Sequence, residues 1–521
     1  MPELQYFTVP LGGGVNTRDA LENLGSDYAV YQFWDNERQG SLTSRNAARR
    51  LYIAGGASNP TTLWSTRNTG GTTAWLVTYS ANGGVVHTSP ALTTDNTLLT
   101  WTTAQVWIGA DTLNSKLWMV NGADTPQSWD MTTNTTTVAT VAAMPVARHI
   151  KMYKNYCFVA GTTANPSRVF FSSIKDPTTW PTNNFQDVAP DDGDQITGMY
   201  PTPEGLMIFK QTSIWMMIGD TFDATNPQWR LIKLNTYGVG GLGYSTAAFL
   251  PGVGVIWLAK DGVYRWNGAT VESVSEKIRP TMELLNTYAV GYAATVNGIT
   301  YNNRREAQGV VFRNRYWLSV EQGSATTNTR TLLVMDTAGN WQISTESTLV
   351  GWVNFSDTNY TNRLIGNLYP GRELVEWNVN RSTSAATVSF GAGDARTGYL
   401  TMGDPTRLKH FRRCFALYSV DNGFGTMTMT ITITPDGDTT RDVTLTFTAA
   451  NGTAISGGLG DVAHLTETMY RRDVDINIQA RMVQLRIQSS VASQTDTRIL
   501  AALHNLTFEY STESVHGGAL V

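Results

Sequence analysis

The stretch VIWLAKDGVYRW, residues 255–266, decides the fold. It contains two short apolar segments, residues 255–259 and 263–266, which flank the polar turn Lys260-Asp261-Gly262. An Asp-Gly pair between two apolar runs predicts a β-hairpin. A single two-stranded hairpin is only marginally stable in water, so this one must pack against further β-structure.

The same kind of hairpin recurs on both sides of this stretch. The pairs of predicted strands are 75–79 with 85–87, 105–109 with 116–120, 156–160 with 168–172, 206–210 with 213–218, 255–259 with 263–266, 315–320 with 331–335, and 363–366 with 373–377. The middle units are separated by about 50 residues, and a β-rich repeat of that period is typical of a propeller blade. We therefore predict an all-β protein with a β-propeller, with six blades as the first choice and seven as the second. A row of β-sandwiches is the alternative.

The composition agrees with an all-β protein. Charged residues make up 15% of the 521 residues, below the roughly 25% that is usual for soluble chains. Thr, Asn, Gly and Ser take their place, and the chain has 16 Trp. Blades packed radially leave wedge-shaped gaps between them, and we expect the large aromatic side chains to fill these gaps.

The pattern changes toward both ends of the chain. Residues 1–54 hold little periodic apolar sequence and are predicted to be an irregular N-terminal arm that orders on a partner. Residues 55–384 are assigned to the propeller, with one helical segment at 273–285. Residues 385–521 are predicted to form a β-sandwich-like tail or platform domain, because Thr426–Thr434 alternates strictly between polar and apolar residues.

Charge and targeting signals exclude several classes of protein. The 38 basic and 42 acidic residues give a net charge of −4, which provides no electrostatic footprint for wrapping duplex DNA. The N-terminus lacks the features of a secretion signal, and no run of 18 apolar residues predicts a membrane anchor. Cys157 and Cys414 are expected to be buried thiols in a protein made in a reducing cytoplasm.

Motifs for catalysis are scarce, and we expect no enzymatic activity and no cofactor. The six His residues show no metal-binding spacing, and neither a G-x-S-x-G elbow nor a P-loop occurs. The GVGGLG stretch at 238–243 lacks a strand-to-helix context and is interpreted as a loop between blades. Residues 336–341 match a sialidase Asp-box only in part, as an ordinary hairpin turn would. Paired carboxylates for glycoside hydrolysis stay open, because their spacing is spatial.

The densest acidic cluster is QDVAPDDGDQITG, which contains Asp187, Asp191, Asp192 and Asp194. Carboxylate oxygens around a glycine are ligands that Ca²⁺ uses, so Asp191, Asp192 and Asp194 are a weak calcium candidate. The cluster lacks the twelve-residue loop with a terminal Glu. A solvated turn between blades is the alternative.

Basic residues are clustered near the N-terminus and in the predicted second domain. The candidate contacts to another subunit or partner are Arg45, Arg49, Arg50, Arg412, Arg413, Arg471 and Arg472. Arginine is suited to pairing with a neighbour's carboxylates. A solvated face is the alternative, because surface charges often contribute little.

Three stretches resemble proteins of short-tailed bacteriophages. They are PLGGGVNTRDA with GSLTSRNAARR near the N-terminus, DPTTW with DDGDQITGMYPTPEGLMIFKQTSIWMMIG in the centre, and RTGYLTMGDPTRLKHFRR with YRRDVDI in the last third. The chain resembles the tail nozzle family of podovirus-type phages, also called tail tubular protein B or packaged-DNA stabilisation protein.

The resemblance implies a structural virion protein and not an enzyme. It implies a homo-hexameric ring below the portal and the tail adaptor protein, located in the virion tail after synthesis in the host cytoplasm. The lumen of the ring would conduct and retain viral DNA without recognising its sequence, and tail fibres or a needle or plug protein would be further partners. The alternative from another class is a propeller that binds or hydrolyses glycans on the host surface, with Trp and Tyr rings stacking on sugars.

Overall fold

The computed structural model describes residues 3–32, 34–35, 42–44, 48–53, 60–68, 70, 73–80, 84–88, 95–103, 108–132, 136–219, 229–241, 245–283, 294–296, 299–301, 307–322, 329–346, 349–356, 362–368, 373–377, 387–388, 393–421, 427–448, 453–455, 467–491 and 501–512. The chain forms two compact units. One consists of Met1–Arg49, Asn340–Ser344 and Asn378–Val521, and the other of Arg50–Gly339 and Thr345–Trp377.

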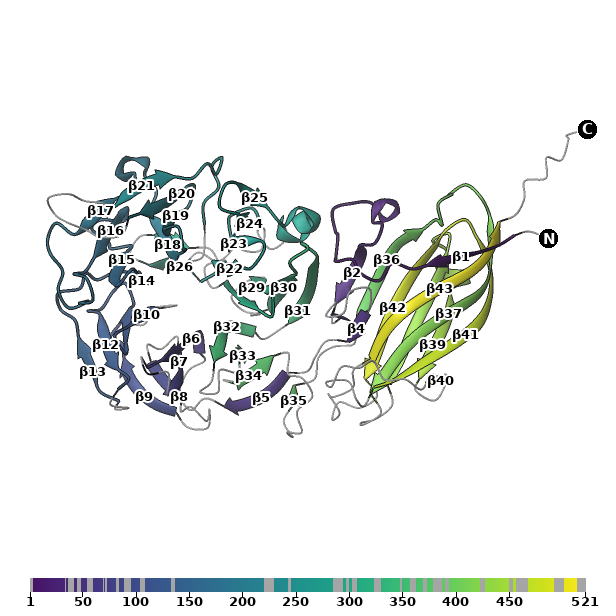
Figure 1. The fold of residues 1–521 in the computed structure, drawn as a ribbon, viewed down its shortest axis with the longest axis horizontal. Coiled ribbons are helices and arrows are strands. Elements are labelled where there is room, and N and C mark those ends of the chain that lie inside the picture. The colour runs from purple at the N-terminus through teal and green to yellow at the C-terminus, as the bar shows by residue number, and fades with distance from the viewer. Residues whose placement is uncertain are drawn as a thin grey trace, which may run out of the picture. The chain divides into compact units, whose positions relative to one another are not determined.

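The second of these units is a β-propeller. Six of its sheets contain four consecutive strands, which makes each of them a blade (Figure 1). Blades 1–3 are β6 (Pro60–Arg67), β7 (Ala74–Ser80), β8 (Gly84–Thr88) and β9 (Asp95–Thr100); β10 (Gly109–Leu113), β11 (Lys116–Val120), β12 (Gln127–Asp130) and β13 (Val138–Thr140); and β14 (His149–Tyr153), β15 (Tyr156–Ala160), β16 (Arg168–Phe171) and β17 (Phe185–Asp187).

Blades 4–6 are β18 (Ile196–Pro201), β19 (Leu206–Lys210), β20 (Ile214–Ile218) and β21 (Arg230–Lys233); β22 (Ala248–Leu250), β23 (Gly254–Leu258), β24 (Val263–Trp266) and β25 (Val271–Ser273); and β28 (Gln308–Phe312), β29 (Arg315–Gln322), β30 (Thr329–Met335) and β31 (Trp341–Glu346). Short elements lie in the connections: the 3-10 helices η2 (Pro190–Asp192) and η3 (Glu276–Ile278), and the hairpin of β26 (Ala294–Val296) and β27 (Ile299–Tyr301). Residues 279–283 continue η3 as a helical turn, inside the predicted helical segment 273–285.

The seventh blade closes the ring with strands from both ends of the propeller sequence. It contains β32 (Leu349–Ser356), β33 (Asn362–Leu368) and β34 (Glu373–Trp377), and then β5 (Ala48–Ile53), which is flanked by β35 (Thr387–Val388). The described residues therefore form seven blades, which is the second choice of the sequence analysis and not the first. Six of the seven hairpins recognised in the sequence supply the second and third strands of a separate blade. The exception is the hairpin 105–109 with 116–120: its second strand is β11, but its first strand was placed too early, because β10 begins at Gly109.

Hydrophobic side chains from neighbouring blades form the core. Trp75 of blade 1 meets Trp129 of blade 2 edge-on, with ring centroids 5.3 Å apart, and Leu63 and Phe355 belong to the cluster that joins blade 1 to blade 7. None of the tryptophans whose side chains the structure describes is exposed. Those most completely buried are Trp75, Trp129, Trp257, Trp317, Trp341 and Trp377. The expectation that tryptophans pack between blades is confirmed for this part of the chain.

The other unit is a sandwich of two antiparallel sheets. A five-stranded sheet contains β2 (Tyr28–Gln32), β36 (Asp394–Leu400), β42 (Val483–Val491), β38 (Met427–Pro435) and β39 (Val443–Thr448). A seven-stranded sheet contains β1 (Leu4–Thr8), β3 (Trp34–Asp35), β4 (Leu42–Ser44), β43 (Ala501–Thr512), β37 (Lys409–Asp421), β41 (Glu467–Ala480) and β40 (Thr453–Ile455). The 3-10 helices η1 (Leu21–Asn23) and η5 (Thr439–Arg441) lie beside the sheets. Met429, Ile431 and Ile433 are buried, as the alternation in β38 predicts.

The N-terminal segment differs from the predicted irregular arm. β1 pairs with β43, β2 pairs with β36, and β4 pairs with β43, so strands from residues 1–49 complete both sheets of the sandwich. Val9, Leu11, Tyr28 and Tyr31 are buried in this unit. The predicted division at 54/55 and 384/385 is thus replaced by units in which the two chain ends fold together. The sequence signal failed because these strands are short and separated by glycine-rich turns.

Within the described residues, no helix is both long enough and apolar enough to cross a membrane.

Candidate functional site

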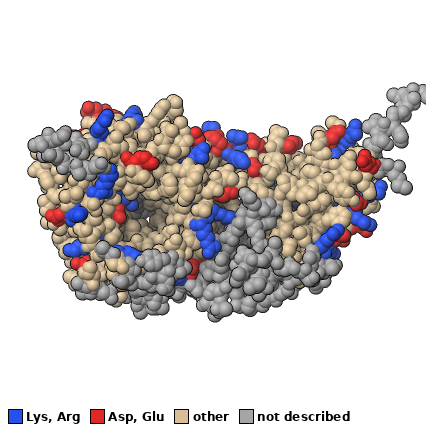
Figure 2. Space-filling view, in the orientation of Figure 1, with Lys and Arg blue, Asp and Glu red and all other residues tan. Residues whose placement is uncertain are grey.

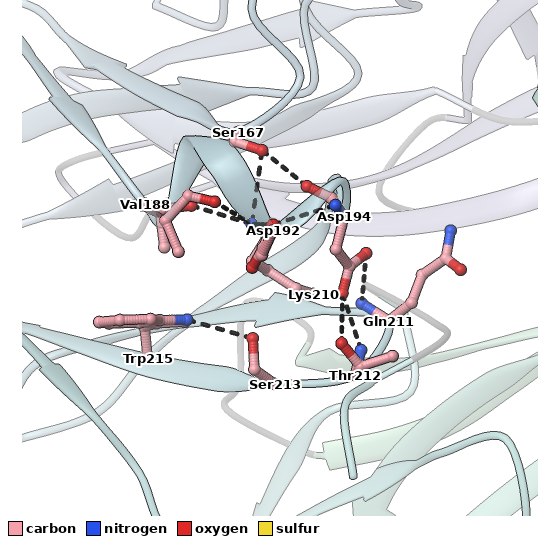
Figure 3. A network of polar contacts seen from close by, with 10 residues as sticks. Ser167, Val188, Asp192, Asp194, Lys210, Gln211, Thr212, Ser213 and Trp215 are labelled. Carbon is pink, nitrogen blue, oxygen red and sulfur yellow. Dashed lines mark hydrogen bonds and ion pairs between the residues drawn. The ribbon is translucent and has the colours of Figure 1, made fainter. Parts of the chain in front are cut away.

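The acidic cluster after β17 folds around one buried lysine. Lys210, the last residue of β19, has a completely buried side chain. Its Nζ donates to the carbonyl oxygens of Val188 at 2.9 Å and Ala189 at 3.0 Å, and to Asp192 Oδ1 at 2.5 Å (Figure 3). The same ammonium lies 3.4 Å from the hydroxyl of Ser167. We call these five residues the Lys210 network.

The carboxylates of the cluster are directed to separate partners. Asp187 accepts two hydrogen bonds from Arg168, at 2.6 and 2.8 Å, and Asp192 pairs with Lys210. Asp194 accepts hydrogen bonds from the backbone N–H groups of Gln211 and Thr212 (Figure 3). A calcium site would need several of these oxygens converging on one point. The geometry does not support the calcium candidate of Asp191, Asp192 and Asp194.

The charge of Lys210 sets the state of Asp192. Partial burial raises the pKa of Asp192, but hydrogen bonds from Lys210 and from the Asp194 N–H, together with the positive charges of Lys210 and Lys233, lower it below its ordinary value of 3.8. Asp192 is therefore ionised at neutral pH. A buried ammonium held by a carboxylate and two carbonyls is a fixed structural ion pair and has no free position for a substrate.

The backbone around Lys210 also joins blade 4 to the next blade. Gly241 N–H donates to Lys210 O at 2.9 Å, and Trp257 Nε1 donates to Gly240 O at 3.1 Å. A Cβ on Gly240 would lie 2.1 Å from Lys210 O, so only glycine fits there. The described part of the predicted GVGGLG loop, residues 238–241, lies in the connection between β21 and β22, as expected for a loop between blades.

The candidate contact arginines have different surroundings. Arg413 on β37 pairs with Asp475 of its own chain at 2.9 Å, and Arg471 on β41 pairs with Asp473 at 3.1 Å. Arg472 donates to the carbonyl of Thr446. Within the chain, Arg413 and Arg471 thus pair with carboxylates of their own sheet, and their contact with a neighbouring subunit stays a prediction.

Arg412 is the exception. It is exposed, it lies where the register between β37 and its neighbours shifts, and no described residue pairs with its guanidinium. Arg45 lies outside the described residues, as do the side chains of Arg49 and Arg50, which belong to β5. The structure thus leaves Arg412 as the candidate with an uncompensated charge.

Arg413 and Arg471 belong to a continuous exposed surface of the seven-stranded sheet, which we call the outer face. Tyr6, Glu509, Arg413 and Asp475 follow one another across β1, β43, β37 and β41. Tyr6 is 63% exposed, and its hydroxyl donates to Glu509 at 3.2 Å. Figure 2 shows positive and negative side chains side by side on this unit. Sequence reasoning missed Tyr6 and Glu509, because the two lie some 500 positions apart in the chain and meet only through strand pairing.

The contact between Tyr6 and Phe415 gives the outer face an aromatic centre. The two ring centroids are 6.4 Å apart, and the guanidinium of Arg471 lies 5.8 Å from the Phe415 ring. An exposed tyrosine beside alternating charges is the composition that protein interfaces favour. The outer face is therefore the candidate functional surface.

Other chemistry is sparse in the part of the chain that the structure describes. No group of three His, Cys, Asp or Glu side chains there is placed to hold a metal ion. Cys157 and Cys414 are buried and unpaired, and burial raises the pKa of both thiols, that of Cys414 to about 12. The partial Asp-box is a turn, in which Asp336 Oδ1 accepts the N–H of Ala338 at 2.9 Å.

Comparisons with known proteins give structural similarities only. No protein-family model matches the chain, and no curated protein matches it. BamB from Moraxella catarrhalis aligns at a TM-score of 0.36 and 12% identity, over 65% of this chain and 93% of that one. The C-terminal WD40 domain of Sif2 gives 0.36 and 10%, over 65% and 91%. The computationally designed Ika8 protein gives 0.34 and 12%, over 63% and 99%. At these TM-scores the similarities carry no information about function, and the propeller is assigned from its sheet topology.

Proposed function

We propose that the chain is a structural component of a phage tail, namely the subunit of a hexameric nozzle ring that conducts and retains packaged DNA below the portal and adaptor. The observation that carries the proposal is where the nozzle-like stretches lie. Residues 10–20 and 396–413 are far apart in sequence, yet they belong to one compact unit. In that unit, Gly398 of β36 approaches the backbone of Leu21 so closely that a Cβ would lie 2.3 Å from the Leu21 carbonyl oxygen.

This packing supports the proposal because it brings two of the nozzle-like stretches, which are far apart in sequence, into one folded unit. A glycine at 398 is needed only if the N-terminal segment lies against β36. The two stretches therefore belong to the same folded unit, as expected if this unit as a whole is related to its counterpart in the nozzle family. The third stretch lies in the propeller and contains the acidic residues and Lys210 of the Lys210 network.

The outer face supports assembly into a ring. It combines exposed Tyr6 with charge pairs that are satisfied within the chain, and Arg412 adds a charge that none of the described residues compensates. Such a surface stays soluble alone and can pair with a neighbour that supplies a carboxylate. In this proposal the subunit contact uses Arg412 and Tyr6, and it does not require the N-terminal segment to order on a partner.

The glycan-binding alternative keeps only part of its premise. Sugar stacking needs exposed aromatic rings; no tryptophan with a described side chain is exposed, whereas Tyr6 and Tyr237 are. The absence of a nucleophile and base pair in the sequence is a further reason to propose a non-enzymatic role.

Electron microscopy of tails that contain this chain tests the proposal. We expect six copies in a ring around the tail axis, next to the adaptor. Copies found in fibres or in the capsid shell would overturn it. A monomer in dilute solution would not, because a ring of this kind can require the adaptor as a template.

Charge reversal tests the surface that we assign to the contact. Arg412→Glu should prevent incorporation into the ring while the chain still folds. Arg230→Glu is the matched control, because Arg230 is an exposed arginine on β21 of the propeller. Equal incorporation of both variants would remove the outer face from the proposal.

A further inference from the structure

A cavity of about 180 Å³ lies on the axis of the propeller. Every blade contributes to its lining, through β6, β10, β14, β18, β28 and β32 and through the residues at the start of β22. These are the first strands of their blades, which is why the cavity is axial. Figure 2 shows the propeller unit hollowed near its middle. The Lys210 network and the outer face contribute no residue to it.

One cation lines this cavity, and no carboxylate belongs to its described lining. Lys151 on β14 is half-buried, and no hydrogen bond or ion pair joins its ammonium to any described residue. Lys210 and Lys409, the two lysines that are fully buried, each have several oxygen partners. Lys151 is therefore a positive charge beside a partly open hollow, and none of the described residues neutralises it.

Two further polar atoms near this space are covered by protein. Trp352 and Thr62 lie on β32 and β6 of adjoining blades, and each is 4% exposed. Trp352 Nε1 and Thr62 Oγ1 have no hydrogen-bond partner in the structure, but both atoms are buried, so a ligand in the cavity does not reach them.

Tyr200 on β18 adds a hydroxyl to the lining. Its hydroxyl oxygen accepts the N–H of Phe249 at 3.0 Å, and no described residue accepts its proton. Burial raises the pKa of Tyr200, so the hydroxyl stays protonated and able to donate. The lining thus offers the Lys151 ammonium and the Tyr200 hydroxyl, and a ligand that meets them must bring acceptor oxygens.

The remaining walls are largely apolar and limit what can enter. Leu63, Ile150 and Met199 line the cavity beside the Trp352 ring. A bare inorganic anion would leave these surfaces unsatisfied, whereas a carboxylate on a small apolar body meets both the donors and the walls. We propose that the axial cavity of the propeller is a binding site for a small organic carboxylate, with Lys151 as its charge partner. This inference is independent of the nozzle proposal.

Isothermal titration with benzoate is the direct test, because benzoate is small enough for the cavity and carries one carboxylate. We expect binding with a dissociation constant of roughly 1 mM or better, the range of a fragment-sized ligand. Benzyl alcohol, which has similar size and no charge, should bind at least tenfold more weakly. Inorganic phosphate should also bind at least tenfold more weakly, because it cannot use the apolar walls.

Substitutions assign the binding to the cavity. Lys151→Met should weaken benzoate binding at least tenfold, and Lys151→Arg should retain it because the charge stays. Lys260→Met is the matched control, since Lys260 is exposed in the turn between β23 and β24. Tyr200→Phe keeps the ring and removes the hydroxyl, and we expect a loss of about threefold in affinity.

Two results would overturn the proposal. One is the absence of benzoate binding at about 10 mM to wild-type protein with normal thermal unfolding. The other is unchanged benzoate affinity in Lys151→Met. If Lys151→Met unfolds, the pair Lys151→Arg and Tyr200→Phe decides: full affinity in Tyr200→Phe together with loss in Lys151→Arg would contradict the site as described.

Discussion

Blades 1–6 of the propeller form from strands that follow one another in the chain, whereas the sandwich combines residues 1–49 with residues 378–521. In the propeller, strand pairing is local and only blade 7 needs a distant strand. In the sandwich, β43 pairs with β1, and β36 pairs with β2, across most of the sequence. The comparison shows that two all-β regions of one chain can differ completely in how local their contacts are.

The two regions also bury a lysine in different ways. Lys210 in the propeller has a carboxylate partner in Asp192. Lys409 in the sandwich is 1% exposed, and its Nζ donates to the carbonyls of Asp404, Arg407 and Arg481. Burial lowers the pKa of Lys409, and the charges of Asp404 and Asp436 only partly oppose this. The propeller lysine is neutralised, and the sandwich lysine is only solvated by backbone dipoles.

The largest expected effect comes from separating the regions. A chain ending at residue 383 keeps β1, β2 and β4 but removes their partners β43 and β36. The buried side chains Val9, Leu11, Tyr28 and Tyr31 then lose their packing, and such losses together exceed the roughly 5–15 kcal/mol that stabilises a domain. We expect this chain to aggregate in size-exclusion chromatography.

The matched control for that truncation is the segment 48–388, which retains β5 and β35 for blade 7. We expect it to stay monomeric and to unfold cooperatively on heating. A soluble chain ending at 383, with an insoluble 48–388 segment, would show that the propeller depends on residues 1–47, contrary to the division into a propeller and a sandwich.

The next largest expected effect is a difference in the free energy of unfolding between substitutions of the two buried lysines. Lys210→Met leaves Asp192 and two carbonyls without their donor, and we expect it to lower the free energy of unfolding by about 3 kcal/mol. Lys409→Met orphans carbonyls but also removes an uncompensated buried charge, so we expect a loss of about 1–2 kcal/mol. Hydrogen exchange read by mass spectrometry reports each unit separately. A larger loss for Lys409→Met would reverse the comparison.

The pH dependence should have the same sign in both units but fall in different pH ranges. The folded-state pKa of Asp192 lies below its ordinary value of 3.8, so its stabilising contribution is present above that pH and is lost as the pH falls through the lower value. The folded-state pKa of Lys409 lies below 10.5, so the unfolded chain binds this proton more tightly and sandwich stability rises as the pH increases toward 10.5. Difference curves of unfolding free energy against pH, for Asp192→Asn and Lys409→Met relative to wild type, should show these dependences in separate pH ranges. Flat difference curves would contradict both assignments.

The smallest effect concerns exposed ion pairs. Arg168 and Asp187 in the propeller form a two-bond pair, and the Arg168 guanidinium lies 3.8 Å from the centre of the Phe185 ring. Arg168→Ala should cost about 1 kcal/mol. Arg413 and Asp475 in the sandwich are more exposed, and Arg413→Ala should leave the thermal midpoint unchanged within error. A larger shift for Arg413→Ala would indicate that the outer face also stabilises the fold.

The contrast in locality explains what the sequence could predict. The central strands of each blade are buried on both faces, so they stand out as apolar runs, and β15, β19, β24 and β34 begin and end as predicted. The inner strand β14, HIKMY, mixes polar and apolar residues and gives no such signal. The strands of residues 1–49 are recognisable only through partners that lie hundreds of residues later.

The candidate site was less predictable than the fold. The arginines were visible as clusters, but the pairing of Arg413 with Asp475 depends on the register between β37 and β41. The acidic cluster was visible too, but its role follows from Lys210, which lies in an apolar strand with nothing to indicate a buried charge. Lys151 and Tyr200 of the axial cavity come from two blades and share no motif.

The closure of blade 7 has a consequence for the time course of synthesis. β5 leaves the ribosome early, but its partner β34 is translated roughly 300 residues later, which takes about 15–60 s at ordinary rates of elongation. Throughout that interval the nascent chain carries β5 with an unpaired edge, and β1, β2 and β4 wait even longer for the end of the chain. Unpaired edges are templates for aggregation, so the growing polypeptide depends on being shielded by the cell until its last strands arrive.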